Sequence, residues 1–113
     1  MIYQKSIKNE VSALGVGLHT GQKVRVVLKP AKENTGIIFK RIDIKVPIEI
    51  KINPQAVKET RLSSTIGADE HRISTVEHLM SALSALGVDN ILIEVGGSEI
   101  PIMDGSSIPF VYL

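Results

Sequence analysis

The sequence of 113 residues contains no cysteine and no tryptophan, and its aromatic side chains are two tyrosines and two phenylalanines. Without cysteine, the chain can form neither a disulfide nor a thiolate metal site. Histidine, aspartate and glutamate are therefore its first-choice metal ligands. Because the chain has no cysteines to oxidise, it fits a reducing compartment, and we expect a cytoplasmic protein.

Long apolar runs and a dominant charge are also missing. No apolar run approaches the ~20 residues of a membrane span. The first ten residues, MIYQKSIKNE, carry charges throughout and have no apolar core of signal-peptide length. The formal net charge is +1, with lysines and arginines scattered singly among acids, whereas proteins that neutralise a phosphate backbone cluster their basic residues. We expect neither a membrane span nor a nucleic-acid partner.

What is present fits one folded domain. The chain is 43% hydrophobic and 22% charged, a composition typical of a soluble domain with a single core. Its last residues, SSIPFVYL, end within an apolar segment that has no stop signal or polar tail. We therefore expect residues 1–113 to be a single domain cut from a longer protein.

Alternating apolar residues predict most of the strands. Val24, Val26 and Leu28 alternate with polar neighbours apart from Val27, which favours a half-buried strand over 22–29. Isoleucines at 48, 50 and 52 give the clearest period of two. The glycines of residues 15–21 predict a hairpin connection. Further strands are expected over 36–41, 62–66 and 91–95, and one or two helical turns over 53–59.

One helix is well marked. Ser74, Thr75, Val76 and Glu77 have the form of a capping box, which predicts a helix over 75–86, and Gly87 supplies its stop. The predicted fold is α+β, a two-layer sandwich with a mostly antiparallel sheet and one or two helices on one face. The apolar residues that would face the sheet recur at helical spacing: Val76, Leu79, Met80, Leu83 and Leu86.

The pair Glu77-His78 stands at the start of this helix. His78 points roughly 130° away from the centre of the apolar stripe, and the small residues Ala82 and Ala85 share its face, with Ser81 at the edge. A ligand or a second domain could therefore approach the imidazole. A histidine ligand beside a glutamate is also the local chemistry of H-E-x-x-H zinc hydrolases, although here the order is reversed and the second histidine is absent.

Spacing alone favours a structural interpretation of this pair. Glu77 already has a place as the last residue of the capping box, and a single histidine is often a hydrogen-bonded surface residue. His71 and His19 are possible further metal ligands, but no spacing in the sequence brings them to His78.

Three sequence motifs favour a functional interpretation of Glu77 and His78. In their order and spacing they resemble the UDP-3-O-acyl-N-acetylglucosamine deacetylase family. They are GVGLHTG (15–21), ISTVEHLMSALSALGVDN (73–90) and EIPIMDGSS (99–107). The resemblance covers essentially the whole chain. It implies a domain like the second domain of ribosomal protein S5, and a second domain of similar fold that is absent from this chain.

The resemblance also implies a reaction and roles. The family hydrolyses the acetamide of UDP-3-O-acyl-N-acetylglucosamine in lipid A biosynthesis, a pathway of the Gram-negative envelope, with Zn²⁺ as cofactor. By position, His78 is one of three zinc ligands and Glu77 the general base that activates the zinc-bound water. The other ligands, a histidine and an aspartate, and the histidine that protonates the leaving amine belong to the missing C-terminal domain. The fragment alone is therefore expected to be inactive.

Substrate contacts are carried over in the same way. Leu62 and Ser63 lie in a stretch, residues 60–63, that resembles the family's cleft border, although the same stretch reads equally well as a strand with an inward leucine. His19 resembles the histidine of the glycine-rich motif and is placed near the cleft as a phosphate or substrate contact. A histidine that stabilises the turn is the alternative.

Two further interpretations remain. Glu99 and Asp104 look like paired carboxylates, but proximity in sequence does not supply the converging cleft that a glycosidase needs, and Asp104 with Gly105 fits ordinary turn chemistry. The alternative function is a non-catalytic α+β binding or interaction module, because fold does not assign chemistry. In that case Glu77 acts only as a helix cap.

Overall fold

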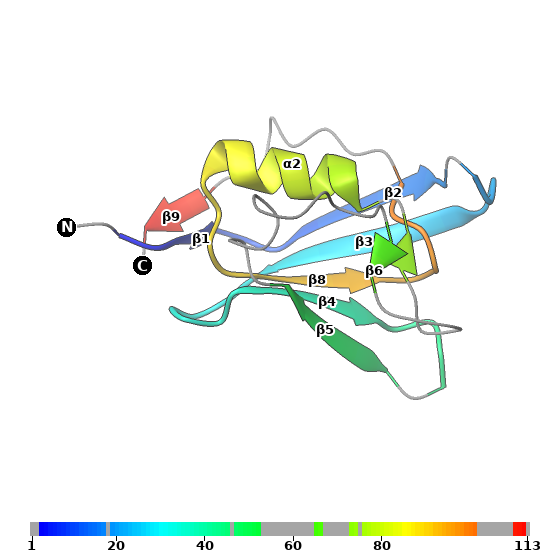
Figure 1. Ribbon diagram of the computed structural model, residues 1–113, viewed down its shortest axis with the longest axis horizontal. Helices are drawn as coiled ribbons and strands as arrows, with labels where there is room; N and C mark the ends of the chain where they lie inside the picture. Colours follow the sequence, from blue (N-terminus) through cyan, green and yellow to red (C-terminus); the bar gives the residue numbers. More distant parts are fainter. Residues whose placement is uncertain are drawn as a thin grey trace.

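The computed structural model describes residues 3–17, 19–45, 47–52, 65–66, 73–74, 76–101 and 110–112. Figure 1 shows a layer of strands with helix α2 (Glu77–Leu86) lying over one face. This arrangement confirms the predicted two-layer α+β sandwich. Within the described ranges, no helix is long and apolar enough to cross a membrane.

The main sheet has five strands in the order β2-β3-β8-β4-β5. These are β2 (Val11–Val16), β3 (Lys23–Pro30), β8 (Ile91–Val95), β4 (Ile37–Arg41) and β5 (Ile48–Ile52). Two short pairs accompany it: β1 (Lys5–Ile7) with β9 (Phe110–Tyr112), and β6 (Thr65–Ile66) with β7 (Ile73–Ser74).

Strand β8 lies between β3 and β4, which are consecutive among the strands along the chain. It pairs antiparallel with β3 and parallel with β4, while β2–β3 and β4–β5 are antiparallel hairpin partners. A parallel pair needs a long crossover connection, and the segment between β4 and β8 contains α2. The sheet is therefore mostly antiparallel, as predicted, with one parallel pair that the sequence did not reveal.

The alternating apolar and polar residues that predicted the strands lie on two different faces of the sheet, one buried and one exposed. In β3, Val24, Val26 and Leu28 are buried, whereas Lys23 and Arg25 are exposed. The strands predicted over 22–29, 36–41, 48–52 and 91–95 are confirmed within one residue at either end. Of the strand predicted over 62–66, residues 65–66 form β6. The helical turns predicted over 53–59 lie outside the described residues.

Helix α2 covers the inner face of the sheet with the residues predicted for that role. Leu79, Met80 and Leu83 are buried, and Leu86 packs against the same core while remaining partly accessible. Burying each such side chain contributes ~1.5–3 kcal/mol, so this row fixes the helix on the sheet. The sheet contributes Val24, Val26, Leu28, Ile37, Phe39, Ile91, Ile93 and Val95 to the core.

The predicted capping box is wrong. The helix begins at Glu77, the residue at its N-cap is the buried Val76, and no side chain caps it there. Ser74 lies instead in β7, where Thr65 is its partner, so strand pairing places it in the small sheet rather than at the helix start. At the other end Gly87 is confirmed as the stop: its φ is 70°, and its N–H donates to Ser84 O.

Candidate functional site

Three segments lie at the same end of the molecule: the tip of the β2–β3 hairpin, the C-terminal end of β8 and the N-terminal end of α2 (Figure 1). The chain leaving β8 packs against the start of β3. The N–H of Gly96 donates to Arg25 O at 2.9 Å, and a Cβ on Gly97 would lie 2.9 Å from Val24 Cγ2. Residues 98–101 are thereby held next to the hairpin tip.

The hairpin tip, residues 17 and 19–22, has a defined backbone; we call it the glycine loop. The N–H of Gly17 donates to Gln22 O at 2.9 Å, and the N–H of Gly21 donates to Gly17 O at 3.0 Å. Gly21 has a φ of 69°, which glycine adopts without the cost that a Cβ would impose. The N–H of Gln22 donates to Thr20 Oγ1 at 3.2 Å. The predicted hairpin connection is confirmed as a closed loop.

Glu99 lies fully buried against this loop, with an exposed fraction of 0%. Its Oε2 accepts the N–H of His19 at 2.9 Å, and its Oε1 accepts the N–H groups of His19 at 3.2 Å and Thr20 at 3.0 Å. Sequence reasoning missed this role and weighed Glu99 only as a partner for Asp104, which lies outside the described residues. Because the partners are about eighty positions apart, no local pattern could have indicated it.

His19 is held through its backbone, while its side chain is exposed. The N–H of residue 19 thus anchors the loop on Glu99. Both roles predicted for the imidazole, the substrate contact and the stabilisation of the turn, stay predictions.

Glu77 and His78 form the first turn of α2. Position 78 belongs to the helix row that continues through the exposed Ser81 and Ala85 and the half-buried Ala82, away from the buried row. The exposed large apolar residues of the described chain, which include Leu14 and Val16, do not lie on this helix. The side chains of positions 77 and 78 are outside the described part, as are His71, Leu62 and Ser63 altogether.

A zinc site needs three protein ligands in addition to water or substrate. The described residues contain no group of three histidine, aspartate or glutamate side chains that could hold a metal ion. A metal site of that kind would therefore need side chains outside the described ones, and the role of His78 as a ligand stays a prediction.

Arg41 and Asp43 form a charged pair where β4 ends. The Arg41 side chain is largely buried, and its Nε and Nη2 donate to the two carboxylate oxygens of Asp43 at 2.9 and 2.7 Å. The hydrogen bond from Arg41 lowers the pKa of the Asp43 carboxyl, against the opposing effect of burial, and raises the pKa of Arg41. This pairing engages two guanidinium nitrogens internally, so we assign Arg41 a structural role.

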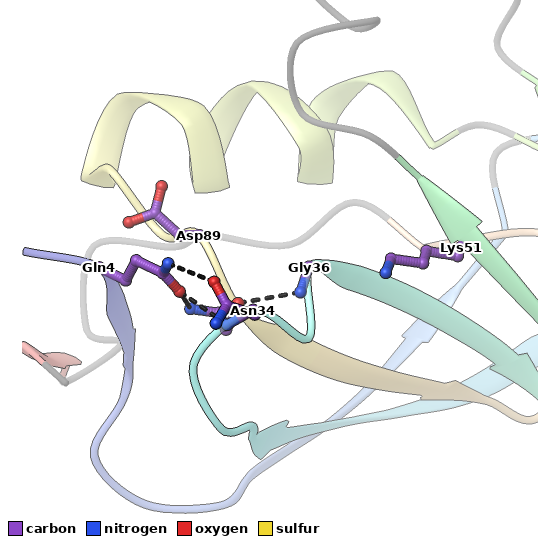
Figure 2. Close-up of a pocket in the computed structure, with 6 residues that line it drawn as sticks. Gln4, Asn34, Gly36, Lys51 and Asp89 are labelled. Carbon is purple, nitrogen blue, oxygen red and sulfur yellow. Dashed lines mark hydrogen bonds between the residues drawn. The ribbon is translucent and has the colours of Figure 1, made fainter.

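A pocket of about 290 Å³ lies at the opposite end of β8, lined by Gln4, Asn34, Gly36, Lys51, Asp89 and Asn90 (Figure 2). Gln4 donates to Asn34 Oδ1 at 2.8 Å and accepts from the N–H of Asn34 and from Asn90 Nδ2, both at 2.8 Å. The buried Asn90 in turn accepts the N–H of Gly36 at 2.9 Å. These amides are engaged with one another, so the cluster braces the fold and is a poor candidate for a catalytic site.

Gly17 provides a test of how tightly the loop fits over Glu99. A Cβ at this position would overlap Glu99 Oε1 and lie 2.6 Å from Thr20 Oγ1. We expect Gly17→Ala to lower the free energy of unfolding by ~1–3 kcal/mol, as overpacking does. Gly21→Ala is the matched control, since nothing lies within 4 Å of its added methyl and only its positive φ carries a cost, ~1–2 kcal/mol. Urea unfolding followed by circular dichroism measures both, and a smaller loss for Gly17→Ala than for Gly21→Ala would contradict the packing described.

Comparison with known proteins matches this chain to a family of enzymes. The family described as LpxC, UDP-3-O-acyl N-acetylglycosamine deacetylase, matches residues 4–113. The chain is similar to proteins named UDP-3-O-acyl-N-acetylglucosamine deacetylase, with 55% identity over 113 residues in Thioalkalivibrio sulfidiphilus, 53% over 114 in Colwellia psychrerythraea and 51% over 114 in Chromobacterium violaceum. Each alignment covers 100% of this chain and 37 or 38% of the relative, so the chain spans little more than a third of these relatives' length.

Proposed function

This chain belongs to the UDP-3-O-acyl-N-acetylglucosamine deacetylase family, and from that membership we propose that the full-length protein containing it is a zinc-dependent amidohydrolase. Its substrate is a UDP-3-O-acyl-N-acetylglucosamine, and its reaction cleaves the acetamide to acetate and a free amine in lipid A biosynthesis, in the cytoplasm. The chain is the N-terminal domain of this enzyme and contributes one part of the active site.

The observation that carries the proposal is the family match over residues 4–113, which includes the glycine loop and the first turn of α2. The structure adds support because both segments lie at one end of the molecule (Figure 1), and position 78 is off the buried row of the helix. The family match also includes residues outside the buried core. Similarity confined to core residues could be explained by packing alone.

In this proposal each residue has a distinct task. His78 donates a ring nitrogen to the metal, and Glu77 accepts a proton from the attacking water as general base. When bound, zinc lowers the pKa of a water molecule and polarises the acetyl carbonyl. Leu62, Ser63 and His19 contact the substrate.

The remaining zinc ligands, a histidine and an aspartate, and the histidine that protonates the leaving amine come from the C-terminal domain. A single histidine from the chain is too few for a zinc hydrolase, so we propose that the chain is inactive alone.

The alternative, a non-catalytic binding module, assigned Glu77 to a helix cap. That assignment needed Ser74 at the start of the helix, yet Ser74 lies in β7 and α2 starts at Glu77. The capping box therefore gives no support to the alternative, and the family match over residues 4–113 favours the deacetylase proposal.

The test compares the full-length protein with the 113-residue chain. We expect the full-length protein to contain one zinc ion per chain by elemental analysis and to release acetate from a UDP-3-O-acyl-N-acetylglucosamine. A chelator should abolish the release, and added zinc should restore it. The 113-residue chain should release none under the same conditions. A metal-free full-length protein, or one that leaves this substrate intact, would contradict the proposal.

A further inference from the structure

The buried carboxylate of Glu99 is the centre of a contact between two segments that are far apart in the sequence. Two successive backbone N–H groups, those of His19 and Thr20, point at it with N to O distances of 2.9 to 3.2 Å. Successive N–H groups converging on one anion form a nest. Here the anion is part of the protein.

The bonds to Glu99 limit the ways in which the glycine loop can bind a ligand. The N–H groups of His19 and Thr20 are already bonded to Glu99, so they cannot cradle an external phosphate in the manner of a phosphate-binding loop. Both residues are nevertheless exposed at the surface. Recognition by this loop therefore falls to side chains, and the direction in which they project depends on the bonds beneath them.

The fit beneath the loop is close. Gly17 leaves room for Glu99 because a Cβ would overlap Oε1, and the packing of Gly96 and Gly97 on β3 holds the chain that leads to Glu99. A buried, hydrogen-bonded carboxylate held by rigid elements can fix the orientation of a neighbouring loop.

We propose that Glu99 is a positioning residue for substrate binding. Its carboxylate sets the backbone of His19 and Thr20 so that the His19 side chain faces the polar head of the substrate, a nucleoside-diphosphate sugar. This inference rests on the proposed function for the identity of the ligand. The contact between Glu99 and the loop stands on the structure alone.

The experiment uses the full-length protein and four variants: Glu99→Gln, His19→Ala, the double variant and Asn90→Ala. Glutamine keeps the size of Glu99 but replaces one acceptor oxygen with an N–H donor, which faces the loop amides unfavourably. We expect Glu99→Gln to raise KM for the UDP-sugar about tenfold or more, with kcat changed by less than about threefold and zinc content unchanged. The double variant should have a KM within about twofold of His19→Ala, because the two residues act through one contact.

Asn90→Ala is the matched control. Asn90 is another buried polar side chain that holds a loop, through the N–H of Gly36, but it lies in the cluster at the opposite end of β8. We expect it to lower the melting temperature without a change in KM. If Asn90→Ala raises KM as much as Glu99→Gln does, a general loss of structure explains both, and the inference is overturned.

Two results overturn the inference while the proposed function stands: an unchanged KM in folded Glu99→Gln, or KM increases that multiply in the double variant. Should Glu99→Gln not fold, amide exchange in the wild-type protein decides. The amides of His19 and Thr20 should then exchange at least about tenfold more slowly than that of Glu33, an exposed residue in the turn between β3 and β4, and equal rates would refute the contact. Wild-type protein without acetate release would overturn the proposed function instead.

Discussion

Replacing His78 with alanine in the full-length protein is expected to remove the zinc ion and to lower kcat/KM for acetate release by ~1,000-fold or more. In the proposed site His78 is one of three protein ligands, and its loss would leave a site too weak to hold the metal through purification and to activate a water molecule. Elemental analysis and the acetate assay measure the two effects on the same sample.

The fold should survive this substitution. Position 78 shares its helix row with Ser81 and Ala85, which are exposed, and not with the buried row that holds α2 on the sheet. The melting temperature of metal-free wild-type protein is therefore the correct reference for His78→Ala. A variant that retains zinc and activity would remove His78 from the metal site.

Two other histidines serve as controls for the metal. His71→Ala should keep both zinc and activity, and His19→Ala should keep zinc while weakening substrate binding. Loss of zinc from either variant would identify a ligand in this chain that we do not assign. It would also reopen the division of ligands between the two domains.

Replacing Glu77 with glutamine is expected to lower kcat by ~100- to 10,000-fold, the usual contribution of a general base, with one zinc ion retained. The glutamine side chain has nearly the same size but cannot accept a proton from water. Since α2 starts at Glu77 without the predicted capping box, we expect a stability change below the ~1 kcal/mol that the loss of a cap costs.

An unchanged kcat would remove Glu77 from the mechanism and leave it a structural residue. Glutamine also fits the last position of a capping box, so Glu77→Gln does not by itself test the cap. The comparison is sharpest with Ser74→Ala, which should affect neither kcat nor zinc. Under the capping-box hypothesis Ser74→Ala would instead cost ~1 kcal/mol of stability, whereas Glu77→Gln would cost little because glutamine can replace glutamate in the box.

Sequence patterns predicted the parts of the fold that depend on neighbouring residues. The stripe from Leu79 to Leu83 and the stop at Gly87 were predicted correctly because helical spacing and backbone freedom are local properties. The alternation in β3 and β5 likewise identifies strands with two different faces. The failed capping box shows the limit of this reasoning, because pairing with Thr65, a contact outside the helix, placed Ser74 in a strand.

Long-range features could not be predicted in this way. Nothing local distinguishes β8 as the strand between β3 and β4, and consecutive strands are more often neighbours. The pairing of β1 with β9 joins residues about a hundred positions apart.

The same limit applies to the candidate site, because local sequence patterns alone did not identify its residues. Glu77 and His78 were identified through the resemblance to a family and not through spacing. The link from Glu99 to His19 needed the tertiary structure, since a single glutamate between Ser98 and Ile100 gives no sign of where its side chain is buried.

The central position of β8 has a consequence for how the protein is made. Until the chain has been synthesised past Val95, the hairpins β2–β3 and β4–β5 have no strand to join them, so a nascent chain carries two separate ribbons with open edges. Pairing of β8 with β3 on one side and β4 on the other covers the inner edge of each hairpin. Ribosome-bound intermediates shorter than this point are thus the ones most exposed to aggregation and to capture by chaperones.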